Sequence, residues 1–371
     1  MNRSDDKIPE PLLADQSSES DSVTREQTRK FQHHRLVSKI QAEGVKRIPM
    51  KTRRIRVFLV ASMGVLTIAC GVTQLLWGSP QEGGPAAASS DPHYQFVSID
   101  GSSAATNTLA FGINDSHLVS GFYSDASTEG HGFLWRRGTV QTVDYPGAAI
   151  TEFGPLNNLD VAVLNYGDVN TEHAATYDAR RAAWTTLPDI PGQPVNFGDG
   201  INDLGSTDGA ACQGNLNAYT DCEAWTWNGR KYSLFTVPQA APGTAFPTGS
   251  NDSRKLVGYY QDASGVYHGF LKIGDHFTTV DVPFAGASGS FLYAINNLDE
   301  MVGAYLDASG FPHGVIVRRG VFTTVDVPFT GALGTNILGI NDRGDISGQW
   351  FDSALGHGFV ALSIKRSRPV R

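Results

Sequence analysis

Two stretches of equal length and matching pattern decide the fold: residues 256–283, LVGYYQDASGVYHGFLKIGDHFTTVDVP, and residues 301–328, MVGAYLDASGFPHGVIVRRGVFTTVDVP. The second stretch follows the first by 45 residues, and each alternates short β-rich runs with turn residues such as Asp-Ala-Ser-Gly. Such runs, bounded by Gly, Asp and Ser, are the sequence signal of strands. Self-similarity at a fixed period indicates a fold built from equivalent units.

An Asn-containing motif, Ile/Leu-Asn-Asp/Asn, marks these units along the chain. It opens at intervals of 43, 45, 49, 45 and 45 residues, at Ile113, Leu156, Ile201, the variant Ser250, Ile295 and Ile340. Each unit holds four strand-like runs, so the sequence predicts an all-β fold, a six-bladed β-propeller of four-stranded blades. A right-handed β-helix is the alternative, but its coils are shorter than 45 residues.

The two ends of the repeat region predict how the ring closes. The sixth unit stops after its third run, HGFVAL at residues 357–362, and lacks a fourth strand. An unassigned run, FVSID at residues 96–100, precedes the first unit and matches FTTVD at residues 322–326. We therefore expect residues 96–99 to pair antiparallel with residues 359–362, so that the N-terminal strand closes the ring.

The N-terminal part of the chain predicts a membrane anchor. An uncharged run of 21 residues begins at Val57 and ends at Trp77, and basic residues precede it. This length spans a bilayer, and the flanking charge places the N-terminus in the cytoplasm. The predicted domains are a disordered cytoplasmic tail (1–54), a transmembrane signal-anchor helix (55–78), a flexible linker (79–93), the propeller (94–363) and a basic C-terminal tail (364–371).

Two alternatives to the anchor also export the propeller. A start at Met50 gives a charged and then an apolar segment of signal-peptide lengths, and LTIAC at residues 66–70 is similar to a bacterial lipoprotein box with lipidation at Cys70. Ala86, Ala87 and Ala88 form a small-residue cleavage site. The predicted location is the cytoplasmic (inner) membrane, single-pass, with the propeller outside the cytoplasm; a secreted or lipidated product is the alternative.

Charge excludes one class of partner. Residues 1–56 carry 13 Lys/Arg against 8 Asp/Glu, and the remainder carries 16 against 29. Phosphate neutralisation needs a basic surface, so this acidic remainder argues against nucleic acid.

Several repeated motifs point to one family. Gly112-Ile113-Asn114-Asp115 and the His-Gly-Phe sequences at His131, His268 and His357 make the chain similar to the HAF-type extracellular repeat family of bacterial surface proteins. The resemblance covers residues 95–362 and implies an exported repeat protein without an assigned reaction. Units two and three depart from the motif, with His173-Ala174-Ala175 and Glu223-Ala224-Trp225.

The recurring histidines predict structural pairs. If Arg137 and Gly138 form a two-residue hairpin turn, His131 faces Asp144 across the hairpin. The same count, with a longer turn in the second unit, gives the pairs His131 with Asp144, His173 with Asp189, His268 with Asp281, His313 with Asp326, and His357 with Asp100. Repetition around a ring favours a structural role over a single reactive site.

The cysteines and the Asp-rich loops complete the inventory. Cys212 and Cys222 flank a predicted hairpin loop in an exported domain, so they predict a disulfide. Each Asp-Ala-Ser loop supplies one acid, whereas Ca²⁺ binds six to eight oxygens, so we expect ordinary turns. No nucleotide, zinc or serine-hydrolase motif occurs, and we predict neither metal nor cofactor.

Positions that break a repeat are the better candidates for function, because folding already explains those that keep it. Units two and three have long polar loops at the same position of the repeat, between the second and third predicted strands. We predict that these loops bind a ligand, either glycan or peptide, through Asp168, Asn170, Glu172, Asn215, Asn217, Tyr219 and Asp221. The predicted function is a membrane-tethered extracytoplasmic binding or scaffolding module. The alternatives are a propeller-based hydrolase or lyase acting on envelope or extracellular polymers, and a purely structural envelope protein.

Overall fold

The computed structural model describes residues 94–125 and 130–364, and these residues form strands joined by turns. In these ranges no helix is long and apolar enough to cross a membrane. The predicted tail, signal anchor, linker and basic C-terminus lie outside the described residues, except Ile364.

The strands pair antiparallel in six groups of four, which we call blades one to six. Blade one contains β2 (Asn107–Ile113), β3 (Val119–Ser124), β4 (Gly130–Arg136) and β5 (Thr139–Thr142). Blade two contains β6 (Ile150–Leu156), β7 (Val161–Gly167), β8 (Glu172–Asp178) and β9 (Ala183–Thr186). Blade three contains β10 (Val195–Ile201), β11 (Thr207–Asn215), β12 (Ala218–Trp227) and β13 (Tyr232–Phe235).

The other three blades repeat the order. Blade four contains β14 (Phe246–Ser250), β15 (Lys255–Gln261), β16 (Tyr267–Ile273) and β17 (His276–Val280). Blade five contains β18 (Gly289–Ile295), β19 (Met301–Leu306), β20 (Pro312–Arg318) and β21 (Val321–Thr324). Blade six contains β22 (Gly334–Ile340), β23 (Ile346–Phe351), β24 (Gly356–Ser363) and β1 (Tyr94–Ile99). This is an all-β, propeller-like fold, and 24 strands fit six blades of four.

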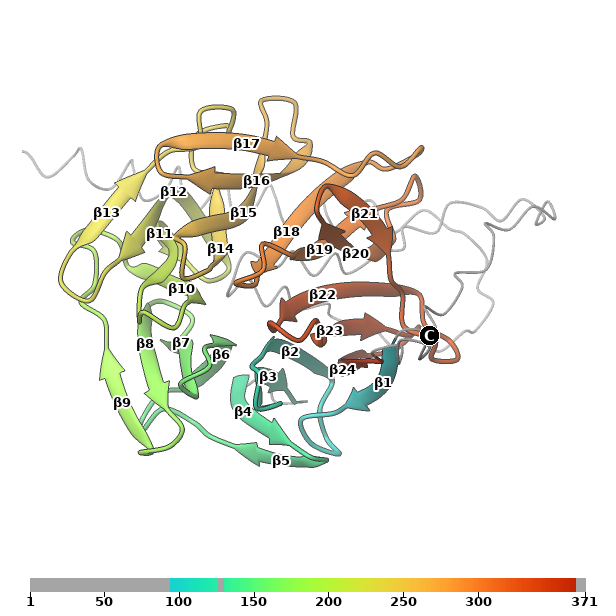
Figure 1. Ribbon diagram of the computed structural model, residues 1–371. Helices are drawn as coiled ribbons and strands as arrows, with labels where there is room; N and C mark the ends of the chain where they lie inside the picture. The colour runs from blue at the N-terminus through green and yellow to red at the C-terminus, as the bar shows by residue number, and fades with distance from the viewer. Residues whose placement is uncertain (1–93, 126–129, 365–371) are drawn as a thin grey trace, which may run out of the picture. The chain divides into compact units, whose positions relative to one another are not determined.

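The blades are arranged around a common centre, with the first strand of each blade innermost and the fourth outermost (Figure 1). Strand β1, from the start of the described chain, pairs antiparallel with β24 at its end. Val97 lies opposite Val360 and Ile99 opposite Gly358, the register that the unassigned N-terminal run predicts. The ring is therefore closed by hydrogen bonds between two segments about 260 residues apart.

A glycine recurs in the second strand because the inner strand comes very close to it. A Cβ on Gly258 would lie 2.2 Å from the main-chain oxygen of Phe246, a distance no side chain tolerates. The inner strand has a register shift next to this contact, between Pro247 and Gly249. Such bulges bend a strand and increase its twist. The glycine of the repeated Val-Gly pattern is thus required by a close contact between the backbones of the first and second strands.

Aromatic and aliphatic side chains fill the centre of the ring. One buried cluster takes residues from the inner strands of several blades, among them Leu109, Phe197, Phe246, Phe291 and Leu338. Residues between blades are equally enclosed: Phe133, Phe270 and Phe359 of the His-Gly-Phe motifs are 0% exposed. The interior is thus a packed core, which confines the candidate sites to the two ends of the ring and to polar groups buried within it.

Candidate functional site

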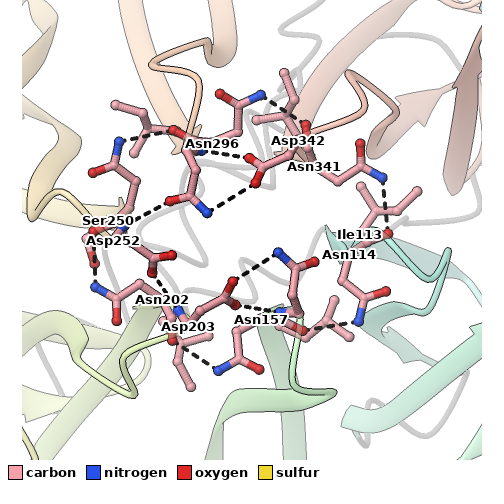
Figure 2. A pocket seen from close by; sticks show the side chains of 17 residues that line it. Ile113, Asn114, Asn157, Asn202, Asp203, Ser250, Asp252, Asn296, Asn341 and Asp342 are labelled. Carbon is pink, nitrogen blue, oxygen red and sulfur yellow. Dashed lines mark hydrogen bonds between the residues drawn. The ribbon is translucent and has the colours of Figure 1, made fainter.

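The Asn-containing motif closes one end of the ring. The side-chain amide of each motif Asn donates a hydrogen bond to the main-chain oxygen of the motif Asn in the next blade, at 2.9–3.1 Å (Figure 2). The series runs through Asn114, Asn157, Asn202, Asn251, Asn296, Asn341 and back to Asn114. We call this closed circle the Asn girdle.

A second circle reinforces the girdle. The main-chain N–H of the residue after each Asn donates to the side-chain oxygen of its counterpart in the next blade, at 2.7–3.1 Å. These counterparts are Asp115, Asn158, Asp203, Asp252, Asn297 and Asp342. The turns surround a pocket of about 60 Å³. Burial and the neighbouring charge of Asp342 raise the pKa of Asp115. Since the lining side chains already bind one another, we assign this pocket a structural role.

The five histidines lie toward the opposite end of the ring, one in each blade except blade three. Their Nδ1 atoms lie 2.8–3.0 Å from the carboxylates of Asp144, Asp189, Asp281, Asp326 and Asp100. Each ring also packs on an aromatic residue of the second strand: Tyr123, Tyr166, Tyr260, Tyr305 or Trp350. Because the pairs are spread around the ring, they do not converge on one reacting group.

The polar loop of blade two is ordered by its own turn. The carboxylate of Asp168 accepts hydrogen bonds from the N–H groups of Asn170 (2.7 Å) and Thr171 (3.0 Å). These bonds, with that from Asn170 the most important, lower the pKa of Asp168. Asn170 itself is exposed. Asp168 therefore holds the turn, and Asn170 is available to a ligand.

The polar loop of blade three is the tip of a longer hairpin. Asn215 accepts from the N–H groups of Asn217 (3.0 Å) and Ala218 (3.1 Å), which shapes the tip. The predicted disulfide joins Cys212 and Cys222, with their Cα atoms 4.1 Å apart, across an irregularity in the β11–β12 register. A bridge at this point fixes the hairpin on the body of the blade.

The two loops touch. The N–H of Leu216, at the tip of the blade-three hairpin, donates to the main-chain oxygen of Val169 in blade two at 3.2 Å. Asn217, the next residue after Leu216, is exposed, Tyr219 is partly buried, and Asp221 is exposed farther along β12. We call the exposed surface formed by Asp168, Asn170, Asn217 and Asp221 the loop platform.

Glu172 does not belong to the platform. It was predicted on the projecting loop, but it is 0% exposed. Its backbone explains the difference: the N–H of Glu172 donates to Pro194 at 3.1 Å, and Glu172 pairs with Val195 in a parallel bridge between blades two and three. The residue that follows the loop is thus drawn into the interface between the blades.

Beneath the platform, Glu172 joins two further buried acids, Glu152 on β6 and Asp199 on β10, which are 1% and 4% exposed. Burial and then the charge of Asp199 raise the pKa of Glu152 to about 8. Burial, followed by the charges of Glu152 and Asp199, raises the pKa of Glu172 well above its ordinary value. The strands bring these acids near one another: Glu152 lies opposite Asn165 on β7, and the Asn165 side chain accepts from the N–H of Gly198, the residue before Asp199, at 2.8 Å.

These acids lack partners for several of their oxygens. Both carboxylate oxygens of Glu172 and Asp199, and one of Glu152, have no hydrogen-bond partner among the described residues. A buried charge without a partner is costly, so the carboxyl groups hold their protons to higher pH. Asp208, which accepts from the Ser250 hydroxyl at 2.7 Å, is a fourth such group; burial raises its pKa to about 7 against the effect of that bond.

Tyr219 covers this acid cluster from the hairpin. Its ring packs edge to face on Phe197 and Phe246, with centroids 5.5 and 6.1 Å apart. Burial and then the charge of Asp199 raise the pKa of Tyr219 to about 12. In the part of the chain that the structure describes, His, Cys, Asp and Glu form no group of three or more placed to hold a metal ion. These acids are enclosed in the interior, whereas the platform residues are exposed to solvent.

Comparisons with known proteins find only a weak structural likeness. No protein-family model and no curated protein matches the chain. Among solved structures, AofleA from Arthrobotrys oligospora has a TM-score of 0.46 at 13% identity over 73% of this chain and 86% of that one. The fucose-specific lectin from Aleuria aurantia has 0.43 at 11% over 71% and 98%, and TolB from Acinetobacter baumannii has 0.46 at 9% over 70% and 65%. Likeness at this level says nothing about a ligand.

Proposed function

We propose that the chain is a membrane-tethered, extracytoplasmic six-bladed propeller that binds glycans at the loop platform. The contact between the two repeat-breaking loops carries the proposal: it brings residues of blades two and three onto one surface, and the disulfide fixes half of it. A surface ordered before binding loses less conformational entropy when a ligand arrives.

The exposed groups favour carbohydrate over an extended peptide. The platform offers the amides of Asn170 and Asn217 and the carboxylate of Asp221, which donate to and accept from hydroxyl groups. A peptide bound by strand addition would use the free edge of an outermost strand such as β9 or β13, and it would not need the exposed amides of the platform.

The tether is proposed from the uncharged run that begins at Val57 and from its basic flank. Placement in the HAF-type family likewise rests on the repeated motifs. Fractionation of the full chain tests the tether: we expect retention in membranes after alkaline washing, unchanged by Cys70→Ser. Loss of retention together with loss of a lipid label in that variant supports the lipoprotein instead.

A glycan array followed by titration calorimetry on the full chain in detergent tests the platform. We expect Asn170→Ala, Asn217→Ala and Asp221→Asn each to weaken binding of the selected glycan by roughly tenfold, as loss of a hydrogen bond to a ligand does. Asp275→Asn is the matched control, because Asp275 is exposed in a turn at the opposite end of the ring. Equal affinities in all four variants, or no glycan bound at all, would disprove the platform.

The buried acids favour a second candidate, a hydrolase or lyase. Glu172 lies directly below the loops with a raised pKa, the condition that lets a carboxyl act as a general acid near neutral pH. Incubation of the chain with envelope polysaccharides tests this: cleavage that Glu172→Gln abolishes, with folding intact, supports the enzyme. Binding without cleavage supports the module.

A further inference from the structure

The two ends of the ring differ in charge: one carries twelve Lys/Arg against ten Asp/Glu, and the other carries twelve Asp/Glu and no described Lys or Arg. We call the end with the Asn girdle and the turns between third and fourth strands the girdle face, and the opposite end the loop face. All twelve described Lys and Arg residues lie in girdle-face turns or within two residues of them. They are Arg136, Arg137, Arg180, Arg181, Arg230, Lys231, Arg254, Lys255, Lys272, Arg318, Arg319 and Arg343.

The loop face has no described Lys or Arg and collects acids. Twelve of them lie in its turns, at its strand ends or in the long β11–β12 hairpin: Asp100, Asp125, Asp144, Asp168, Asp189, Asp221, Glu223, Asp262, Asp281, Asp307, Asp326 and Asp352. The net charge of this part of the chain is negative, but the charged residues are unevenly placed. All of its described Lys and Arg residues lie at one end of the ring.

Much of the positive charge is not neutralised locally. Five of the twelve basic residues form ion pairs, for example Arg180 with Asp160 at 2.9 Å and Arg318 with Glu300 at 3.0 Å. The other seven form no ion pair within the described ranges. The acids nearest the axis, such as Asp203 and Asp342, are bound within the girdle. Two of the seven unpaired basic residues, Arg254 and Arg343, lie in girdle turns. The other five lie around the rim: Arg137, Arg230, Lys231, Lys272 and Arg319.

Apolar side chains project from the same turns. Leu159, Leu204 and Leu298 follow the girdle positions in blades two, three and five and are 51%, 62% and 64% exposed. Val321, at a turn on the rim, is 64% exposed. Exposed leucines interspersed with Arg and Lys are the composition that binds at a lipid interface, where the apolar group enters and the cation remains with the headgroups.

Both ends of the described chain leave from this face. The Tyr94 hydroxyl donates to the main-chain oxygen of Gly344 in a girdle-face turn at 3.0 Å, and the N–H of Ser363 donates to Asp345 at 2.8 Å. Four more Lys/Arg follow in residues 365–371, and the fifteen residues 79–93 connect Tyr94 with the proposed membrane span. The flexible linker that the sequence predicts for these residues would cover roughly 20 Å, which would keep the girdle face close to the bilayer.

We propose that the girdle face docks on an anionic phospholipid surface and holds the loop face outward. The docking rests on the proposed tether for its proximity, and on the rim charge and the exposed leucines for its attraction. The leucines distinguish a lipid surface from nucleic acid, since phosphate contacts need the cations alone.

The full chain with Cys70→Ser, reconstituted in vesicles, tests the docking. One environment-sensitive fluorophore is placed at Leu204→Cys on the girdle face and, in a separate protein, at Asn217→Cys on the loop face. We expect quenching by brominated lipid at position 204 to be roughly threefold stronger in phosphatidylcholine with phosphatidylglycerol than in phosphatidylcholine alone, and to disappear at high salt. Position 217 should stay unquenched.

Charge variants and a second measurement separate the outcomes. Combined Arg137→Ser, Arg230→Ser and Arg319→Ser should abolish the difference at position 204, whereas Glu223→Gln on the loop face should not. A chain that stays in the vesicles after alkaline washing with equal quenching in both lipids keeps the tether and overturns the docking. A chain that washes off disproves the tether; it upholds the docking if it still sediments with phosphatidylglycerol vesicles at low salt, and overturns it otherwise. Fluorescence changes with duplex DNA and none with lipid would assign the face to nucleic acid.

Discussion

The girdle face and the loop face are built from the same six units but use the repeat differently. At the girdle face all six blades make the same two contacts with the next blade, and the circle closes. At the loop face the pattern holds for the His–Asp pairs in five blades and fails in the loops of blades two and three.

A closed circle of hydrogen bonds explains this difference. Each girdle Asn is both donor and acceptor, so a blade that changed would leave buried polar groups of its neighbours without partners. The loop face has no contact that all six blades share, so single blades there are free to diverge. The contacts that all six blades share therefore indicate the end that folding constrains. The loops that differ between blades indicate the end that is available for binding.

The largest effect should come from breaking the ring at its closure. Deletion of residues 94–100 removes β1 and exposes the edge of β24. Tyr94 and Ile99 are 7% and 3% exposed, so their loss also opens the core, and we expect a cost of roughly 4 kcal/mol or more together with aggregation.

Melting temperature and light scattering measure this effect, and deletion of residues 365–371 is the control, for which neither should change. A shortened protein that stays monomeric with the melting temperature of the intact chain would show that closure contributes nothing.

The next largest effect compares Asn202 of the girdle with Asn170 of the platform. The Asn202 amide donates to Asn251, and its oxygen accepts from Leu204 and Ser206. Because these hydrogen bonds are buried or partly buried, Asn202→Ala should lower the free energy of unfolding by roughly 2–4 kcal/mol, and Asn170→Ala by less than about 0.5 kcal/mol. Urea unfolding measures both, and equal losses would refute the assignment of the two ends.

Periodicity and turn geometry made much of the fold predictable. The 45-residue period gave the strand order, and the unassigned run at residues 96–100 gave the closing strand. The His–Asp pairs followed from counting across a two-residue turn, since opposite positions in a hairpin are fixed by the turn. These features depend on short stretches of chain or on their repetition.

Features that require several blades to converge were not predictable. The motif Asn was recognised as a marker of each unit, but its partner lies in the next blade and appears only when the inner strands meet. Glu152 and Asp199 were missed for the same reason. Their one signal was a charged residue inside an inner strand, where blades one and five have Leu109 and Tyr293. The net charge likewise did not reveal the basic residues on the rim, because it says nothing about where the charged residues lie in the fold.

The acid cluster should make stability depend on pH. The folded-state pKa values of Glu152 (about 8) and Asp208 (about 7) lie above those of the unfolded chain. This contribution is complete below the unfolded values near pH 4 and is lost as pH rises through the folded ones. We expect the free energy of unfolding to fall by on the order of 5 kcal/mol between pH 5 and 8, because each group contributes about 1.4 kcal/mol per pH unit below its folded pKa.

Thermal unfolding across this range measures the slope. Glu152→Gln removes one titrating group while keeping its shape, so the slope should become shallower. Glu223→Gln, exposed on the hairpin, should leave it unchanged. A slope of opposite sign would mean that the cluster is charged and paired in the folded protein.

The smallest effect should come from the His–Asp pairs, and it should differ among blades. His268 lies 2.8 Å from Asp281, whose side chain is 41% exposed. Burial opposes the charged imidazole, but the hydrogen bonds with Asp281 and Asp262 outweigh it and raise the pKa of His268. Solvent screens such a pair, so His268→Ala should lower the free energy of unfolding by less than about 1 kcal/mol, mostly below pH 6.5. This loss should vanish as pH rises through the raised pKa.

His357→Ala should lower the free energy of unfolding by more, because the bond between His357 and Asp100 joins β24 to the end of β1, and the His357 ring stacks on Trp350 at 4.4 Å. Melting temperatures of the two variants at pH 6 rank them, while glycan affinity at the platform stays constant. Loss of binding in either variant without loss of stability would show that the histidines belong to the binding site and that the loop face is one continuous surface.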